Sequence, residues 1–219
     1  MHRKTLLISL LALACSPAFA DVGAGLQVGT SGYGIDLGYQ LSESFGARLG
    51  YAGFNYSKSM NSTDVDYDAK LKMSATKVLI DWDVAHGFRI SGGLVFNSNK
   101  VDVTGRPTGG VYTINGHTYQ GSEVGSLDGQ IKPSNSVAPY LGIGYGMIGK
   151  SGLGFFADLG AYYQGKLSTN VNVTCGTALS AAQCTQLRSD VAVEQQKVQD
   201  KINGYKWYPV LSIGLSYAF

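Results

Sequence analysis

Long apolar runs, excess charge of one sign and catalytic side chains are all scarce in this 219-residue sequence. After residue 20 no segment offers eighteen consecutive apolar residues, so no transmembrane helix is predicted there. The formal net charge of +2 equals the contribution of Arg3 and Lys4, which leaves the rest of the chain formally neutral. Binding to nucleic acid therefore has no electrostatic support, and we expect none.

Groups that could carry out catalysis are few. No histidine follows His117 and no G-x-S-x-G motif occurs, so the sequence lacks the serine and histidine pattern of lipid hydrolases. His117 follows the Asn-Gly turn of a predicted hairpin at 112–119, where we expect it to be exposed. Residues 144–151 fit the phosphate-binding pattern G-x-x-x-x-G-K-S, but a strand period follows them instead of a helix. We expect no enzyme, no cofactor and no metal site.

The first twenty residues have the pattern of an export signal. Arg3 and Lys4 precede the apolar run 6–14, and Ala18-Phe19-Ala20 provides a small-x-small cleavage site. We expect a signal peptide at 1–20 and a single exported domain at 21–219. The alternative is a lipoprotein that is lipidated at Cys15, because residues 12–15 loosely resemble a lipobox.

Alternation of apolar with small or polar residues is what the exported part has in abundance. It recurs at the period of two that places successive side chains on opposite faces of a strand. Eight segments show it: 22–29, 33–41, 45–52, 76–82, 88–96, 138–146, 153–164 and 207–219. A closed sheet is the one strand arrangement that satisfies every backbone group inside lipid. The pattern predicts an all-β fold, an eight-stranded antiparallel transmembrane β-barrel with one apolar and one small or polar face.

The connections between these segments alternate in length. After the first tight turn, short turns alternate with three long polar stretches, 57–68, 97–136 and 166–205. Short turns on the periplasmic side and long extracellular loops are typical of outer-membrane barrels. We therefore expect both ends of the mature chain on the periplasmic side and three long loops at the cell surface.

The last strand carries a resemblance to a known signal. Residues 207–219 alternate strictly and end on an aromatic residue, with Tyr217 and Phe219 on the apolar face. This ending resembles the assembly signal of bacterial outer-membrane barrels, and over residues 21–219 the architecture resembles small barrels of the OmpA, OmpX and OmpW type. The resemblance implies a Gram-negative outer-membrane location, contact with the barrel-assembly machinery, outer-membrane lipids and lipopolysaccharide, and a monomer.

Six charged residues occupy inward positions of the predicted barrel, three of each sign. A narrow interior makes an isolated charge costly, so we expect these charges to pair and to plug the barrel. The alternative is a proton or ion path along the same carboxylates. The residues are Asp36, Arg48, Lys77, Asp81, Arg89 and Asp158.

The third long stretch contains a predicted disulfide and a predicted helix. Cys175 and Cys184 are the only cysteines after the signal, and export favours their oxidation to a disulfide over reactive thiols. Apolar residues then recur at helical spacing within 178–203, which predicts a short loop helix that caps the barrel mouth or binds a partner. These apolar residues are Leu187, Val191, Val198 and Ile202.

Two classes of function remain open from the sequence. The first is a structural or surface role, in which the long loops meet a host or another surface partner. The second is a narrow conduit for small hydrophobic solutes, which an apolar tunnel would support. Its lining would include Leu79, Val95, Phe156 and Val210.

Overall fold

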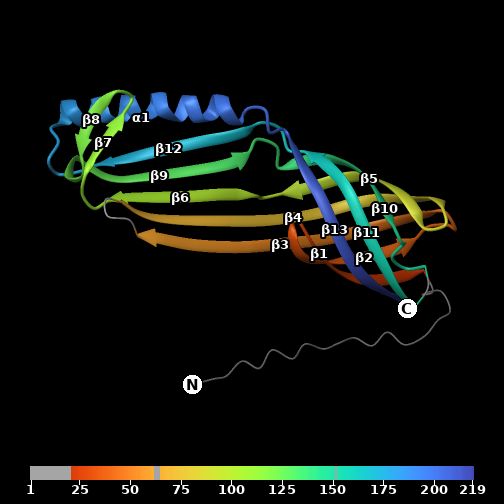
Figure 1. The fold of residues 1–219 in the computed structure, drawn as a ribbon. Coiled ribbons are helices and arrows are strands. Elements are labelled where there is room, and N and C mark those ends of the chain that lie inside the picture. Colours follow the sequence, from red (N-terminus) through yellow and green to blue (C-terminus); the bar gives the residue numbers. More distant parts are fainter. Residues whose placement is uncertain (1–20, 62–64, 151) are drawn as a thin grey trace, which may run out of the picture.

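A ring of eight antiparallel strands forms the core of the protein. The computed structural model describes residues 21–61, 65–150 and 152–219, so the predicted signal peptide lies outside the described residues. The ring closes because β13 pairs with both β11 and β1, and β4 pairs with β5 (Figure 1). The prediction of an eight-stranded antiparallel transmembrane β-barrel is confirmed. In ring order the strands are β1 (Val22–Gly29), β2 (Gly32–Gln40), β3 (Phe45–Asn61), β4 (Val65–Ala85), β5 (Phe88–Asn97), β10 (Val137–Tyr145), β11 (Leu153–Tyr163) and β13 (Trp207–Ala218).

The two faces of the barrel wall follow the predicted alternation. Leu26 is 69% exposed and lies between Leu215 on one side and Ile35 on the other, which continues an apolar outer surface across three strands. Phe156, which points inward, is fully buried. The backbone of Gly25 and Gly214 approaches its ring so closely that a Cβ at either position would collide with it. Inward glycines thus make room for large side chains in a narrow barrel.

The long polar stretches differ from the prediction because much of them is sheet and not loop. β3 and β4 continue beyond the barrel, and β6 (Lys100–Pro107), β9 (Val124–Pro133) and β12 (Leu167–Cys175) extend the same sheet in the order β3, β4, β6, β9, β12. Figure 1 shows these strands reaching far past the barrel at the end opposite the C-terminus. We call this extension, with the hairpin and the helix that lie on it, the extracellular layer, because the sequence predicts that these long connections lie at the cell surface.

The polarity of the strand faces reverses where the barrel ends. On β4, the face that carries Val78 and Trp82 in the barrel carries Lys72 and Lys70 in the extension, while the opposite face changes from polar to apolar at Met73. Roughly ten residues of a tilted strand cross a bilayer, which is the separation between Trp82 and Lys72. The reversal therefore marks the boundary between hydrocarbon and water. Because the apolar residues change to the other face of the strand there, uniform alternation in the sequence did not predict the extension.

One face of the extension is covered by a hairpin and a helix. The hairpin pairs β7 (Val111–Ile114) with β8 (His117–Gln120) through Asn115 and Gly116, both at positive φ, and η2 (Gly121–Glu123) follows. α1 (Ala181–Ile202) has 22 residues and is longer than the short helix predicted. Leu187 and Val191 are buried with Tyr119 and Val124 in a small apolar core. No helix in the described ranges is long and apolar enough to cross a membrane.

The helix covers the sheet edge, which corrects the expectation that it caps the barrel mouth. Its main contacts are with β12 and β7. Gln195 accepts a hydrogen bond from the backbone N–H of Val171 at 2.8 Å, and Gln199 accepts one from the backbone N–H of Thr169 at 2.9 Å. Both side-chain amides also donate to backbone carbonyls of β12. The helix thus occupies the backbone groups of an edge strand that would otherwise be open to pairing with another chain.

Candidate functional site

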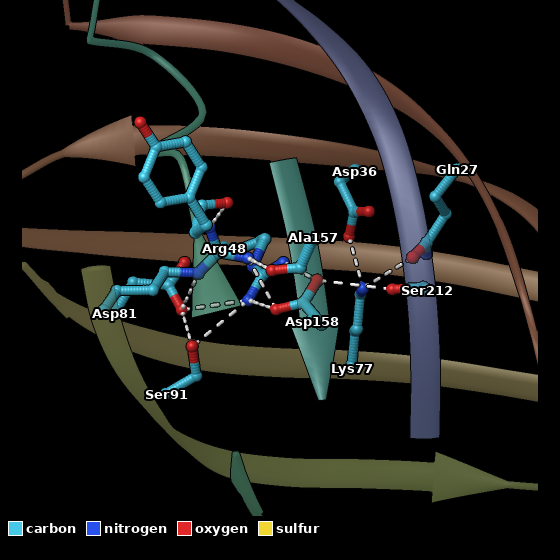
Figure 2. A network of polar contacts seen from close by, with 11 residues as sticks. Gln27, Asp36, Arg48, Lys77, Asp81, Ser91, Ala157, Asp158 and Ser212 are labelled. Carbon is cyan, nitrogen blue, oxygen red and sulfur yellow. Dashed lines mark hydrogen bonds and ion pairs between the residues drawn. The ribbon is translucent and has the colours of Figure 1, made fainter. Parts of the chain in front are cut away.

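The inward charges meet in one network across the barrel interior. The guanidinium of Arg48, which is 2% exposed, donates to Asp158 at 2.8 and 3.0 Å and to Asp81 at 3.0 Å. Arg89 donates to the same Asp158 carboxylate at 2.5 Å, and its Nε lies 3.6 Å from Asp81. Figure 2 shows Arg48, Asp81 and Asp158 converging from different strands. Two buried cations and two buried carboxylates therefore pair with one another inside the barrel.

The remaining two charges form an ion pair beside this cluster. Nζ of Lys77 lies 3.0 Å from the carboxylate of Asp36, which is fully buried, and it donates to Gln27 at 3.1 Å (Figure 2). All six inward charges named from the sequence are thus in ion pairs. Charges with such partners tolerate a dry interior that an isolated charge would not.

Small polar residues complete the network, and the sequence analysis missed them. The hydroxyl of Ser91 donates to Asp81, and that of Ser212 donates to Asp158 at 3.3 Å. Carbonyl oxygens of Tyr145 and Ala157 accept from Arg89. The inward parity of Ser91 and Ser212 was visible in the sequence, but small residues at such positions are common and gave no reason to single them out.

Aromatic side chains fill the barrel above the charges. The rings of Tyr162 and Tyr208 stack at 4.9 Å between centroids, and Tyr140 is buried beside them. A cavity of about 30 Å³ lies between this layer and the charges and is lined in part by Tyr162, Lys77 and Asp158. That volume is about enough for one water molecule.

The residues expected to line an apolar tunnel are instead packed against other side chains. Leu79 and Val95 are 2% and 3% exposed and belong to the same buried cluster as Tyr140. Val210 packs against that cluster, and Phe156 is fully buried. Val95 and Val210 line the cavity of about 30 Å³ inside the barrel, and that volume is much too small for a solute.

A second polar cluster lies in the extracellular layer, around Asp190 of α1. This carboxylate is 1% exposed and accepts hydrogen bonds from Tyr119 at 2.5 Å and from Asn115 at 3.0 Å. It also lies 2.9 Å from Nδ1 of His117, so the predicted hairpin tip is bound to the helix even though the histidine side chain is 58% exposed. Sequence reasoning missed Asp190, because an acid in a polar helix gives no sign of burial.

The cluster predicts an acid-sensitive attachment of the hairpin. The hydrogen bond from Tyr119 is the largest influence on Asp190, and it lowers the pKa of this carboxyl below the ordinary 3.8. A carboxyl with a lowered pKa in the folded state adds stability above its unfolded pKa, and that stability is lost as the pH falls through the folded value. We expect the protection factors of the amides in β7 and β8 against hydrogen exchange to fall as the pH falls below about 3.8. Asp190→Asn should remove this pH dependence, and an unchanged acid response in that variant would contradict the assignment.

The disulfide is confirmed between Cys175 and Cys184. Their Cα atoms are 5.8 Å apart, and the bond ties the end of β12 to the first turns of α1. In the chain-entropy description, closing so short a loop stabilises the fold by about 2 to 3 kcal/mol. The bond fixes the start of the helix at the strand edge that its glutamines cover.

An apolar pocket of about 410 Å³ lies between the extension sheet, the hairpin and the helix. Its floor includes Val65 and Val103 on the sheet, and its sides include Ile114 and Val191. It is far larger than the cavity inside the barrel, and its volume is within the range of small-molecule sites. No sequence signal marked it, since its walls come from six separate elements.

The predicted assembly signal lies on the outer surface of the barrel. Tyr217 is 54% exposed and Phe219 66% exposed, and their rings meet edge to face at 5.6 Å. Tyr217 lies opposite Ala24 on β1, at the seam where the barrel closes. Recognition of these residues by the assembly machinery stays a prediction.

Comparison with known proteins places this fold among outer-membrane barrels. No family model matches the chain, and no curated protein matches it. A crystal structure of CarO from Acinetobacter baumannii is 25% identical, with a TM-score of 0.57 over 91% of this chain and 98% of CarO. CarO2 of the same species is 24% identical, with a TM-score of 0.55 over 90% and 98% of the two chains. A major outer membrane protein from Thermus thermophilus is 16% identical, with a TM-score of 0.42 over 90% and 97% of the two chains. The likeness to CarO spans barrel and extracellular layer together, and this chain is an outer-membrane β-barrel protein.

Proposed function

We propose that this protein is a closed barrel that acts at the cell surface through its extracellular layer. The observation that carries the proposal is the network of Arg48, Arg89, Asp81 and Asp158, which joins opposite strands inside the membrane-spanning part. An aromatic layer lies above it, and the cavity between the two has room for about one water molecule. By contrast, the surfaces of the extracellular layer, which could meet a partner, lie outside the membrane.

The conduit for small hydrophobic solutes is the second candidate, and the extracellular pocket favours it. An apolar solute could collect there before it crosses. A path through the barrel would then require Tyr140, Tyr162 and Tyr208 to separate, and the solute would meet the buried charges next. Passage along this path has a free-energy cost that the surface role does not have, because it brings an apolar solute into contact with ionised groups.

Solute flux in liposomes separates the two candidates. Proteoliposomes that carry the wild-type chain should take up a small apolar dye no faster than protein-free liposomes of the same lipid. The Cys175→Ser/Cys184→Ser variant, which should loosen the extracellular layer but leave the barrel intact, serves as the matched control. If the barrel itself is the barrier, this variant should also take up the dye no faster than protein-free liposomes. Dye uptake that requires the protein would contradict the closed barrel and favour the conduit.

Lipopolysaccharide is the first partner that we propose for the surface. Lys72 lies directly opposite Lys100, and the register of the next strand places Lys132 beside Lys100, all on the outward face just above the hydrocarbon boundary. Like charges that lie opposite one another in a sheet repel, and Asp102, 3.5 Å from Lys100, is a single carboxylate beside this row of three lysines. The phosphate groups of lipopolysaccharide lie at this height in the outer leaflet, and they would compensate that repulsion.

Removal of the lysine row is expected to weaken lipopolysaccharide binding strongly. A basic residue near an anionic lipid surface contributes about 1 kcal/mol, so Lys72→Gln/Lys100→Gln/Lys132→Gln should lose about 2 to 3 kcal/mol of binding free energy in calorimetric titrations. Without lipopolysaccharide the same variant should keep the stability of the wild type within about 0.5 kcal/mol, since it removes both the repulsion between the lysines and the Lys100–Asp102 ion pair. Lys58→Gln, on the opposite face, is the control. Equal affinities for all three proteins would refute this contact.

The other expected partners remain part of the proposal. The barrel-assembly machinery would read Tyr217 and Phe219 during insertion. A host molecule or a neighbouring surface protein would meet the extracellular layer. We expect the barrel itself to be a monomer, because α1 already occupies the edge of β12.

A further inference from the structure

Most of the residues that line the apolar pocket of the extracellular layer have hydrocarbon side chains, and Tyr67, Tyr112 and Thr113 add hydroxyl groups. Gln195 lines it, but both ends of its side-chain amide are bonded to the backbone of β12. Glu194 also lines it, and its carboxylate accepts from the N–H of Asn115 at 3.2 Å and from Lys197 at 2.7 Å. A ligand in this pocket would therefore meet mainly carbon atoms, which favours an alkyl chain over a sugar, a peptide or an amino acid.

The pocket continues onto an exposed apolar surface. Tyr67, Val103 and Val198 at its rim are 41%, 37% and 42% exposed. On the neighbouring strand β3, Tyr56 and Met60 are 52% and 48% exposed, and they share the apolar face of the sheet. Exposed apolar patches of this kind mark binding sites in soluble regions of proteins.

One cation lies on this face. Lys58 of β3 is directly opposite Ala69 of β4, and Ala69 is directly opposite Val103 in the pocket wall. Val103 is two strands away from Lys58, so the two backbones are about 10 Å apart. The extended side chain of a lysine can span most of that distance. Among the described residues of the five extension strands, Lys58 is the only charged side chain on the apolar face, and it is in no ion pair. Lys58 thus lies on the same face of the sheet as the pocket, two strands away from Val103 in the pocket wall.

We propose that this pocket binds a free single-chain amphiphile of the fatty-acid class, with its alkyl chain between the sheet and α1 and its carboxylate near Lys58. The pocket volume of about 410 Å³ suits a short or medium chain and not a diacyl lipid. The proposal rests on the surface role given above and names a ligand for it. The site lies on the opposite face of the sheet from the lysine row, so it is separate from the proposed contact with lipopolysaccharide.

Binding of octanoate to the whole mature barrel in lipid nanodiscs tests the proposal. Saturation-transfer NMR should show saturable binding beyond that of empty nanodiscs, and octyltrimethylammonium should bind more weakly than octanoate. Lys58→Gln should weaken octanoate binding about two- to fivefold, as expected for an exposed ion pair, while Lys58→Arg restores it. Binding of octanol, which has no charge, should not change in Lys58→Gln. Lys72→Gln, on the polar face, is the matched control and should bind octanoate like the wild type.

Two filling variants test the position of the chain. Val103→Trp from the sheet and Val198→Trp from the exposed side of the helix should each abolish binding, and the second is tolerated more easily because Val198 is 42% exposed. No saturable octanoate binding, equal binding of the cationic amphiphile, or a dimer that buries this face would overturn the proposal. If octanoate does not bind and the liposomes do not leak, the amphiphile site is refuted but the proposal of a closed barrel is not. Leaking liposomes with intact octanoate binding would instead make the pocket the entrance of a conduit.

Discussion

Asp158→Ala is expected to destabilise the barrel by about 3 to 5 kcal/mol, since it leaves two buried guanidinium groups without their shared carboxylate. Arg48 and Arg89 are 2% and 1% exposed, so water cannot replace the missing partner without opening the barrel. Reversible unfolding in denaturant, followed by tryptophan fluorescence in lipid vesicles, measures the loss.

The control for this substitution is an ion pair of the same type at the surface. Asp102 faces Lys100 at 3.5 Å, and both side chains are partly exposed. Asp102→Ala should change the free energy of unfolding by no more than about 1 kcal/mol. Similar losses for Asp158→Ala and Asp102→Ala would mean that the interior charges are solvated, contrary to a closed barrel.

Val78→Arg is expected to destabilise the barrel by about 2 to 4 kcal/mol, the cost of a cation on the lipid face near the bilayer midplane. Val78 is 48% exposed and lies between Leu49 and Leu94, halfway between Trp82 and the lysines above the boundary. The same unfolding experiment in vesicles measures the change.

An arginine on the same outer face of the extension should be tolerated. Asn172 of β12 lies opposite Asp128, where the outer face is polar. We expect Asn172→Arg to change stability by less than about 0.5 kcal/mol. If both arginines cost the same, the reversal of polarity along the sheet would not mark the membrane boundary.

The barrel strands were predictable because one physical rule governs them. Lipid on one side and a narrow interior on the other force an alternation that the sequence displays from Val22 to Phe219. The six inward charges followed from the same parity. Which charge pairs with which did not, because the shared role of Asp158 between Arg48 and Arg89 depends on the stagger of distant strands.

The extracellular layer was less predictable, because its environment reverses. Lys70 and Lys72 continue the outward face of β4. In a barrel strand that face meets lipid, so lysines at these positions indicate a loop and not a continuing strand. The stripe that begins at Leu187 and Val191 correctly predicted a helix but not its position, since the helix is attached to β12 both by its glutamines and by apolar packing with residues of other elements. A pocket with walls from several elements has no local signal at all.

Single-channel recording of the reconstituted wild-type chain in planar bilayers tests the closed barrel most directly. Because Arg48, Arg89, Asp81 and Asp158 bridge the interior below a layer of packed tyrosines, we expect no steady conductance at any modest voltage. A stable open channel of porin size, formed by protein whose heat-modifiable migration shows it to be folded, would contradict the account.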